Sequence, residues 1–377
     1  MENLRTFRDQ WFPIARVQDI KAGRSYPKQL FGHRIILFRN ENRDIVCLKD
    51  ECSHMGIPLS QGCVKKGRVQ CCYHGWTFNG QGECTDIPRL TLDSTKIREK
   101  ASVPTYPIRQ KYGMVWITVG DPGLCLDSEK EALLLQNNNE ASYYSTQSLT
   151  SYEFPSHYSI ASLNAFDFSH VHIHKILKHF LPVSSGHYKK THIQQDKAQT
   201  TFVDANGENL DVIMQRSPSL QISFKGLSRL RLTRWIDVRV DLQVFGSPVD
   251  KDRSLLFAFP IFRGRPRFLL KILRPIVDFV LRFSFAEDIE IFRFQQSVRD
   301  QGGSFYKNLS PLDASWIKVH HWLQAFDESG LYEETPTIVP EKKPQQATVP
   351  PLSEPDFTLA LSRKPMTREP VQPGGGL

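Results

Sequence analysis

The chain has 377 residues, of which 40% are hydrophobic, so it is long enough for about two domains and at least one sizeable core. Lys and Arg together number 48 and Asp and Glu 40, which leaves a formal net charge of +8. This excess is too diffuse to indicate a nucleic-acid-binding protein, and no nucleic-acid motif appears. It favours contact with an acidic partner or with anionic lipid.

The sequence shows no pattern of export or membrane insertion. Its first residues, MENLRTFRDQWF, carry charges throughout and lack the apolar core of a secretory signal. No uncharged apolar run reaches the roughly 18 residues that a membrane-spanning helix needs. The seven cysteines, an odd number, favour a reducing compartment with metal-binding or inert thiols. We therefore expect a cytoplasmic protein.

Residues 11–120 predict an all-β domain. Short β-rich runs alternate here with Gly, Asn and Asp, and Asn79-Gly80 followed by Gln81-Gly82 predicts a hairpin. The runs are WFPIARV, HRIILFR, DIVCLKD, GRVQCCY, WTFNG and GMVWITVG. Residues 124–150 are polar and predict a connector.

Residues 151 to about 330 predict an α+β domain, in which strands lie between two helical stretches at 160–180 and 268–300. The predicted strands include TTFVDANGENLDVIMQ around a turn, SLQISFKG, RVDLQVFGSP and SLLFAFPIF. From Pro336 onward, nine prolines fall within 42 residues, which predicts a disordered tail over 336–377.

Two short segments combine cysteine and histidine in the first domain. Cys52-Ser53-His54 and Cys71-Cys72-Tyr73-His74 are separated by sixteen residues. Two thiolates and two imidazoles could bind zinc, or a [2Fe–2S] cluster with two sulfur ligands on one iron and two histidines on the other. A zinc finger usually groups its cysteines in one loop and its histidines in another. Here each loop supplies one of each, which favours the cluster.

This pattern resembles the Rieske non-haem iron oxygenases, whose second cluster loop typically reads C-x-Y-H-G-W-x-F. The chain reads CCYHGWTF from Cys71 to Phe78. The resemblance implies a Rieske [2Fe–2S] domain over residues 1–120, with Cys52, His54, Cys71 and His74 as cluster ligands. Cys72 then occupies a spacer position, and we expect it to be a small packed side chain.

The second histidine-rich segment is NAFDFSHVHIH, from Asn164 to His174. In a helix, His170 and His174 share one face with Asp167, while His172 points away by roughly 200°. Two histidines and one carboxylate on one face of Fe(II) form the facial triad of non-haem oxygenases. The family pattern is D-x-x-H followed by a second histidine, usually after four intervening residues. Here three intervene, which leaves His172 as an alternative ligand.

The resemblance implies that the carboxylate ligand lies in a late helix. Asp288 in SFAEDIEIFRFQQ matches best, with Glu287 and Glu290 as competitors. In the family, the acid equivalent to Asp167 is not a ligand. It bridges an iron-bound histidine to a Rieske histidine of the neighbouring subunit, which implies a head-to-tail ring, most often a trimer.

The resemblance therefore implies a catalytic mononuclear-iron domain over 121–335, with an antiparallel sheet flanked by helices. The expected activity uses O2 and electrons from a separate ferredoxin or reductase to hydroxylate or oxidatively demethylate a mostly apolar small molecule. The alternative is a Rieske electron-transfer or redox-sensing protein without a working mononuclear iron site.

Residues 263–283, RGRPRFLLKILRPIVDFVLRF, predict an amphipathic helix with charges at Lys271, Arg274, Asp278 and Arg282 on one face. Two interpretations stay open. The apolar face belongs to the core and leads to Asp288, or the basic segment makes peripheral contact with anionic lipid.

Overall fold

A computed structural model describes residues 10–90, 100–120, 142–144, 150–167, 170–177, 187–194, 197–203, 209–215, 221–233, 236–303 and 313–324. These ranges fall within one compact unit, Met1–Ile338. The proline-rich tail and most of the expected connector lie outside the described residues. The domain boundaries at residues 120 and 335 stay predictions.

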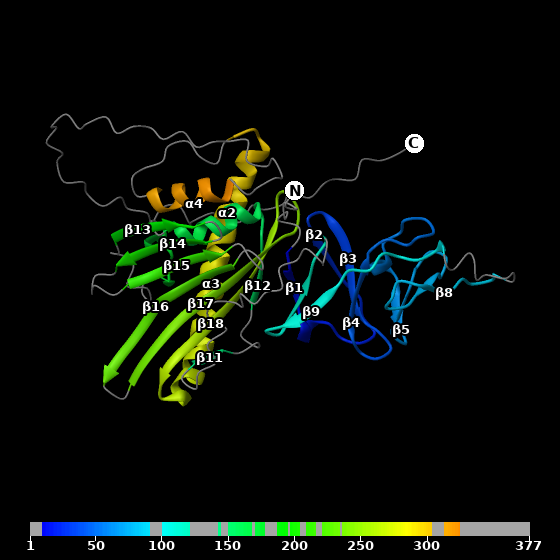
Figure 1. Ribbon diagram of the computed structural model, residues 1–377, viewed down its shortest axis with the longest axis horizontal. Helices are drawn as coiled ribbons and strands as arrows, with labels where there is room; N and C mark the ends of the chain where they lie inside the picture. Colours follow the sequence, from blue (N-terminus) through cyan, green and yellow to red (C-terminus); the bar gives the residue numbers. More distant parts are fainter. Residues whose placement is uncertain are drawn as a thin grey trace, which may run out of the picture. The chain divides into compact units, whose positions relative to one another are not determined.

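The N-terminal part consists of short antiparallel strands, drawn in blue to cyan in Figure 1. They form three small sheets, with orders β1-β10-β9, β2-β3-β4 and β5-β6-β7-β8. The strands are β1 (Phe12–Arg16), β2 (Tyr26–Leu30), β3 (His33–Arg39), β4 (Ile45–Lys49), β5 (Cys63–Lys65), β6 (Arg68–Gln70), β7 (Thr77–Phe78), β8 (Cys84–Asp86), β9 (Ile108–Lys111) and β10 (Met114–Ile117).

Strand β3 has a continuous apolar run because both of its faces are buried. Ile35 and Leu37 belong to one buried cluster, while Ile36 and Phe38 belong to another. Because successive side chains of a strand point to opposite faces, β3 forms a wall between the two clusters. The expected all-β domain is confirmed.

The predicted hairpin joins β7 to β8. The Asn79 Oδ1 atom accepts hydrogen bonds from the backbone N–H groups of Gln81 and Glu83, at 3.0 and 2.9 Å. Gly82 has a φ of +78°, and its carbonyl accepts from the backbone N–H of Val103. This hydrogen bond therefore also joins the sheet of β5 to β8 to the chain segment around Val103.

The C-terminal part contains an eight-stranded antiparallel sheet. Seven of its strands follow the order β11-β18-β17-β16-β15-β14-β13, and the eighth, β12, pairs with β18. Its strands are β11 (Ser142–Tyr144), β12 (Thr150–Phe154), β13 (His187–Ile193), β14 (Lys197–Val203), β15 (Asn209–Gln215), β16 (Gln221–Thr233), β17 (Ile236–Pro248) and β18 (Ser254–Arg265). The strands predicted between residues 200 and 262 all appear in it.

Strands β17 and β18 are buried on both faces. Val244 and Leu256 pack in the cluster that also contains helix residues, while Phe245 and Phe257 pack on the opposite side with Trp116 of the N-terminal part. The Ser247 hydroxyl donates to the Pro13 carbonyl at 2.6 Å across this contact. Burial on both faces accounts for the nearly unbroken apolar run LLFAFPIF of β18.

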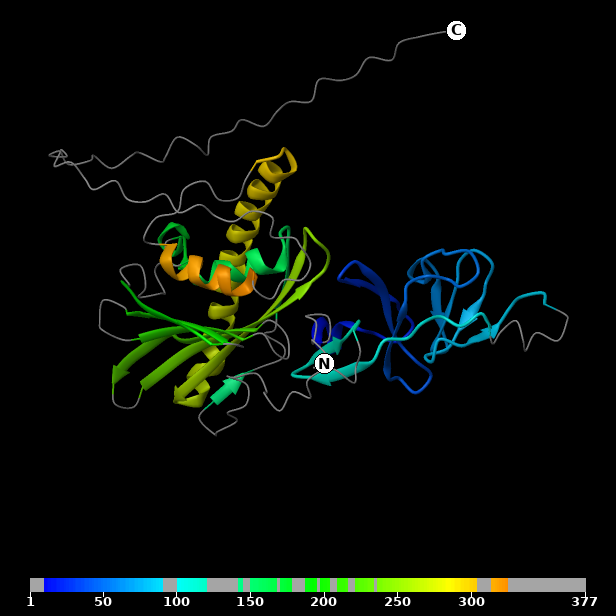
Figure 2. The same ribbon diagram turned by 45° about the horizontal axis from the view of Figure 1, so that its top comes forward.

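The helices α2 (Tyr158–Leu163), α3 (Arg267–Asp300) and α4 (Ala314–Gln324) complete the expected α+β domain. Figures 1 and 2 both show α3 crossing the strands of the sheet. Leu281 and Phe292 of α3 and Val319 of α4 share one core cluster with the sheet. Among the described residues, no helix is long and apolar enough to cross a membrane.

The continuous helix expected over residues 160–180 is wrong. Helix α2 ends at Leu163, a 3₁₀ turn follows over Asn164–Phe166, and Asp167 is extended, with φ −93° and ψ 96°. The Phe166 carbonyl, which a continuing α-helix would direct to the N–H of residue 170, accepts the Ser315 hydroxyl of α4 at 2.9 Å. Tertiary contact thus replaces the helical hydrogen bond.

The Gly82 turn generates a stability prediction. A Cβ atom at Gly82 would lie 2.0 Å from the Val103 carbonyl oxygen, whereas one at Gly23, with a similar φ of +75°, would meet nothing within 4 Å. Both alanine variants carry the cost of a left-handed conformation, about 1 kcal/mol. Gly82→Ala should lower the free energy of unfolding by about 2 kcal/mol more than Gly23→Ala, because only it forces apart two backbone segments. Denaturant titrations measure this, and equal losses would contradict the proposed clash.

Candidate metal centres

Two loops of the N-terminal part repeat the same backbone arrangement. The N–H of Cys52 donates to the carbonyl five residues later, and the Cys52 carbonyl accepts from Gly56. The N–H of Cys71 likewise donates to Trp76, and the Cys71 carbonyl accepts from Gly75. Both glycines have positive φ, +70° and +76°, which a Cβ would disfavour. Each loop thus turns back on its own cysteine.

The loops separate sulfur from imidazole. The side chains of Cys52 and Cys71 are buried, while His54 and His74 are exposed. The two imidazole centroids lie 4.6 Å apart, and the His54 ring stacks on Trp76 at 4.5 Å, with 1° between their planes. Two buried sulfurs and two surface imidazoles therefore lie close together in one place.

This arrangement fits a [2Fe–2S] cluster with unlike ligands on its two irons. Burial raises the pKa of Cys52 to about 11, so the residue holds its proton at neutral pH in the metal-free chain. A cationic metal supplies the charge that lets such a buried thiol ionise. The role of these four residues as cluster ligands stays a prediction, and their positions agree with it.

The expectation that Cys72 is a packed side chain is wrong. Cys72 is exposed, because the loop directs Cys71 inward and its neighbour to the surface. Cys47 and Cys84 are buried among apolar residues, and burial raises the pKa of the Cys47 thiol.

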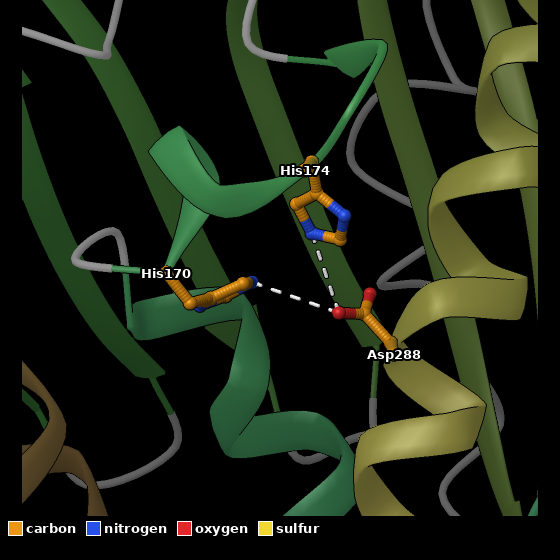
Figure 3. Close-up of side chains that lie close together, drawn as sticks. All are labelled: His170, His174 and Asp288. Atoms are coloured by element: carbon orange, nitrogen blue, oxygen red, sulfur yellow. Dashed lines mark ion pairs between the residues drawn. The ribbon is translucent and has the colours of Figure 1, made fainter. Parts of the chain in front are cut away.

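The second candidate centre lies in the C-terminal part. His170 and His174 flank a short 3₁₀ turn, Val171–Ile173, and Asp288 comes from the middle of α3. Figure 3 shows both imidazoles directed at the Asp288 carboxylate. Residues more than a hundred positions apart in the sequence thus converge, although the two histidines are not on one α-helix.

Each histidine of this centre contacts two carboxylates, one through each ring nitrogen. The Nε2 atoms of His170 and His174 lie 3.8 and 3.3 Å from Asp288 Oδ1. On the other side of each ring, His170 Nδ1 lies 3.2 Å from Asp167 Oδ2, and His174 Nδ1 lies 2.8 Å from Glu287 Oε2. An ionised carboxylate only accepts hydrogen bonds, so the contact with Glu287 favours the tautomer of His174 with the proton on Nδ1. The nearby charge of Asp167 favours the same tautomer of His170, although His170 Nδ1 makes no hydrogen bond in this geometry.

In that tautomer, three atoms with lone pairs face one another. The candidate ligand atoms of His170, His174 and Asp288 all lie within 4.8 Å of one another. Such a set could share a cation, either a proton or a metal ion. Burial alone would lower the pKa of His174, but the hydrogen bonds and charges of Asp288 and Glu287 outweigh it and raise that pKa. Two imidazoles and one carboxylate are also the donor set of the facial triad, so the residues fit Fe(II).

The competing ligands are placed differently. Glu287 accepts from His174 Nδ1 and from the backbone N–H of Lys175, at 2.8 and 3.4 Å, so it supports a histidine rather than joining the triad. Glu290 is exposed. The side chain of His172 lies outside the described side chains. The supporting role of Glu287 could not be read from the sequence, where Glu287 and Asp288 are adjacent acids of one helix.

A cavity of about 100 Å³ opens beside the triad. His170, His174 and Asp288 line one side, and most of the remaining wall is apolar. Among the described residues that line it, none is Lys or Arg. The apolar wall includes residues of α2, four strands and α3: Phe154, Ala161, Ile222, Phe224, Leu242, Val244, Leu256, Leu281 and Phe285. Strand periodicity identifies several of these as core, but their distance from the histidines follows only from the fold.

Parts of this chain are similar in sequence to known proteins. Residues 10–107 match the family model described as Rieske [2Fe-2S] domain. Chlorophyllide a oxygenase of Chlamydomonas reinhardtii is 39% identical over 120 residues, which are 32% of this chain and 17% of that protein. A 4beta-methylsterol monooxygenase of Methylococcus capsulatus is 30% identical over 164 residues, 42% of this chain and 44% of that protein. The chain thus matches less than half the length of these curated relatives.

Solved structures extend the likeness beyond the first domain. A structure of dicamba monooxygenase bound to dicamba has a TM-score of 0.65 and 15% identity, covering 86% of this chain and 98% of that one. NdmA of Pseudomonas putida CBB5 has a TM-score of 0.60 and 18% identity, covering 84% and 89%. At this identity the likeness concerns the fold. The chain therefore carries a Rieske [2Fe–2S] domain and has the fold of the Rieske non-haem iron oxygenases.

Proposed function

We propose that the protein is a Rieske oxygenase that hydroxylates or oxidatively demethylates a mostly apolar small molecule. The observation that carries the proposal is the convergence of His170, His174 and Asp288 on the wall of an apolar cavity. A chain that only transferred electrons through its Rieske domain would need neither this donor set nor the cavity beside it.

The residues divide the work between the two centres. Cys52, His54, Cys71 and His74 would hold the [2Fe–2S] cluster, and His170, His174 and Asp288 would hold Fe(II). The cluster would supply electrons and the mononuclear iron would supply activation of O2. Glu287, through its hydrogen bond, and Asp167, through its nearby charge, would favour protons on Nδ1 of the two histidines, so that each Nε2 lone pair faces the metal position. The apolar wall would exclude water and orient the substrate.

The substrate is proposed to be uncharged and largely apolar. Asn164 and Ser284 are polar residues of the cavity wall, and Ser284 already donates its hydroxyl proton to the Val280 carbonyl at 2.9 Å. A buried carboxylate on the substrate would need a cationic partner, and the described wall offers neither Lys nor Arg. The matched proteins are named for chlorophyllide, a methylsterol and dicamba, so these names do not select one substrate.

Further partners follow from the same proposal. A separate ferredoxin or reductase would reduce the cluster, and the net charge of +8 suits an acidic electron donor. Asp167 would link His170 to a cluster histidine of a neighbouring copy in a head-to-tail ring, which we propose to be a homotrimer. The cytoplasm is the proposed location.

Iron and sulfide content tests the proposal. Protein purified without oxygen and loaded with Fe(II) should contain about three irons and two labile sulfides per chain. The double variant His170→Ala/His174→Ala should keep about two irons and both sulfides. His33→Ala, which changes an exposed histidine outside both centres, serves as the control. About two irons in all three proteins would remove the oxygenase proposal and leave an electron carrier.

The adjacent cysteines of the second cluster loop allow a matched comparison. Cys71→Ser should abolish the visible absorption and the electron paramagnetic resonance signal of a cluster with mixed sulfur and nitrogen ligands, because it removes a buried ligand. Cys72→Ser should leave both spectra unchanged, since this side chain is exposed. Loss of the spectra in both variants would argue against the proposed ligand set.

Glu287 generates a prediction about metal affinity. Glu287→Ala should weaken Fe(II) or Co(II) binding at the mononuclear site by about 10- to 100-fold, because His174 loses the acceptor that orients its ring. Glu287→Gln keeps an acceptor oxygen and should restore most of the affinity. Glu290→Ala is the control. Titration of metal into the cluster-loaded protein measures this, and unchanged affinity in Glu287→Ala would exclude a positioning role.

A further inference from the structure

Helix α3 carries a row of exposed apolar side chains on the side away from the core. Phe268, Ile272, Ile276 and Phe279 are between 46% and 65% exposed. Their spacings of four, four and three residues place them within about 80° of one another around the helix. The row spans about 17 Å along the axis.

This row is separate from the face that builds the core. Leu270, Val280 and Leu281 are buried, the first against the sheet and the last in the central cluster. An amphipathic helix at a protein surface normally has one apolar face and a polar one opposite. The N-terminal half of α3, the long yellow helix of Figure 1, therefore has a second apolar face with no function in the core.

The exposed row is bordered by positive charge. Lys271 and Arg282 are exposed beside it, and Arg274 forms an ion pair with Asp278 at 3.7 Å. Three cations thus stand against one carboxylate, whose side chain is largely buried. Large apolar groups next to a basic strip match the two layers of a membrane surface, acyl chains below and anionic headgroups above.

Other occupants fit less well. Single exposed apolar residues are common, but a contiguous row indicates an interaction surface. Protein interfaces are depleted of lysine at their centre, whereas here Lys271 lies within the span of the row. Because the exposed row runs along the side of the helix, contact would be made with the helix lying in the plane of the surface.

We propose that the segment Phe268–Arg282 of α3 docks the protein peripherally on an anionic lipid surface. The four apolar side chains enter the boundary between headgroups and acyl chains, while Lys271 and Arg282 contact the headgroups. This goes beyond oxygenase activity and stands independently of it. The same helix carries Asp288, so docking would hold the cavity near the membrane surface.

Vesicle sedimentation with the full chain tests the proposal. The protein should bind vesicles of phosphatidylcholine mixed with phosphatidylserine, bind phosphatidylcholine alone weakly, and dissociate at high salt. The triple variant Phe268→Gln/Ile272→Gln/Phe279→Gln should lose at least about 10-fold in binding. Lys271→Gln and Arg282→Gln should each lose about 5-fold on the anionic vesicles.

A control and a second readout separate docking from misfolding. Ile291→Gln/Phe294→Gln changes two apolar residues of the C-terminal half of α3 with similar exposure, and should leave vesicle binding unchanged. In Phe268→Trp, the fluorescence of the new side chain should shift to shorter wavelength when anionic vesicles are added. Circular dichroism and melting temperature should be the same for all variants, because the substituted side chains are exposed.

Three results would overturn the proposal. The first is failure of the wild-type protein to bind anionic vesicles at low salt. The second is equal binding by the triple variant and the control variant. The third is a triple variant that changes the sedimentation mass of the protein and leaves lipid binding intact, which would assign the row to contact between protein copies.

Discussion

The burial of strands β17 and β18 on both faces is the constraint on which the two candidate centres depend. On one face, residues such as Val244 pack with the helix that carries Asp288; on the other, Phe245 and Phe257 pack with Trp116 of the Rieske domain. Where these large apolar side chains lie, both faces of the strand pair are removed from solvent. A large-to-small substitution that leaves a cavity beside β17 or β18 would therefore disturb both the mononuclear site and the contact with the Rieske domain.

Carboxylates organise the mononuclear site by standing on both sides of each imidazole. Asp167 and Glu287 lie beside the Nδ1 atoms of His170 and His174, and Asp288 faces both Nε2 atoms. Three acids around two histidines would repel one another without a cation among them. This balance favours a metal ion or a proton among them, and the two adjacent acids Glu287 and Asp288 lie at different ring nitrogens of His174.

Part of the fold and of the site could be predicted because the signals are local. The continuous apolar run of β3, the Asn79 hairpin and the length of α3 depend on neighbours in sequence, and all three appear as expected. The helix expected through His174 does not, because Ser315, almost 150 residues away, takes the Phe166 carbonyl. Likewise, exposure of Phe268 and Ile272 depends on which face of α3 meets the sheet, and amphipathic spacing alone does not decide that.

The sequence by itself determined the chemistry of the two centres: paired Cys and His in short loops, and two histidines with nearby acids. These choices are readable because ligand atoms must come from a few residue types at short spacing. Only the tertiary structure decided which ring nitrogen of His174 faces Glu287 and which faces Asp288. It also decided that Cys72 faces solvent and that an apolar cavity borders the triad. Those properties depend on distances between segments far apart in the chain, which are set by packing on the sheet and leave no local pattern.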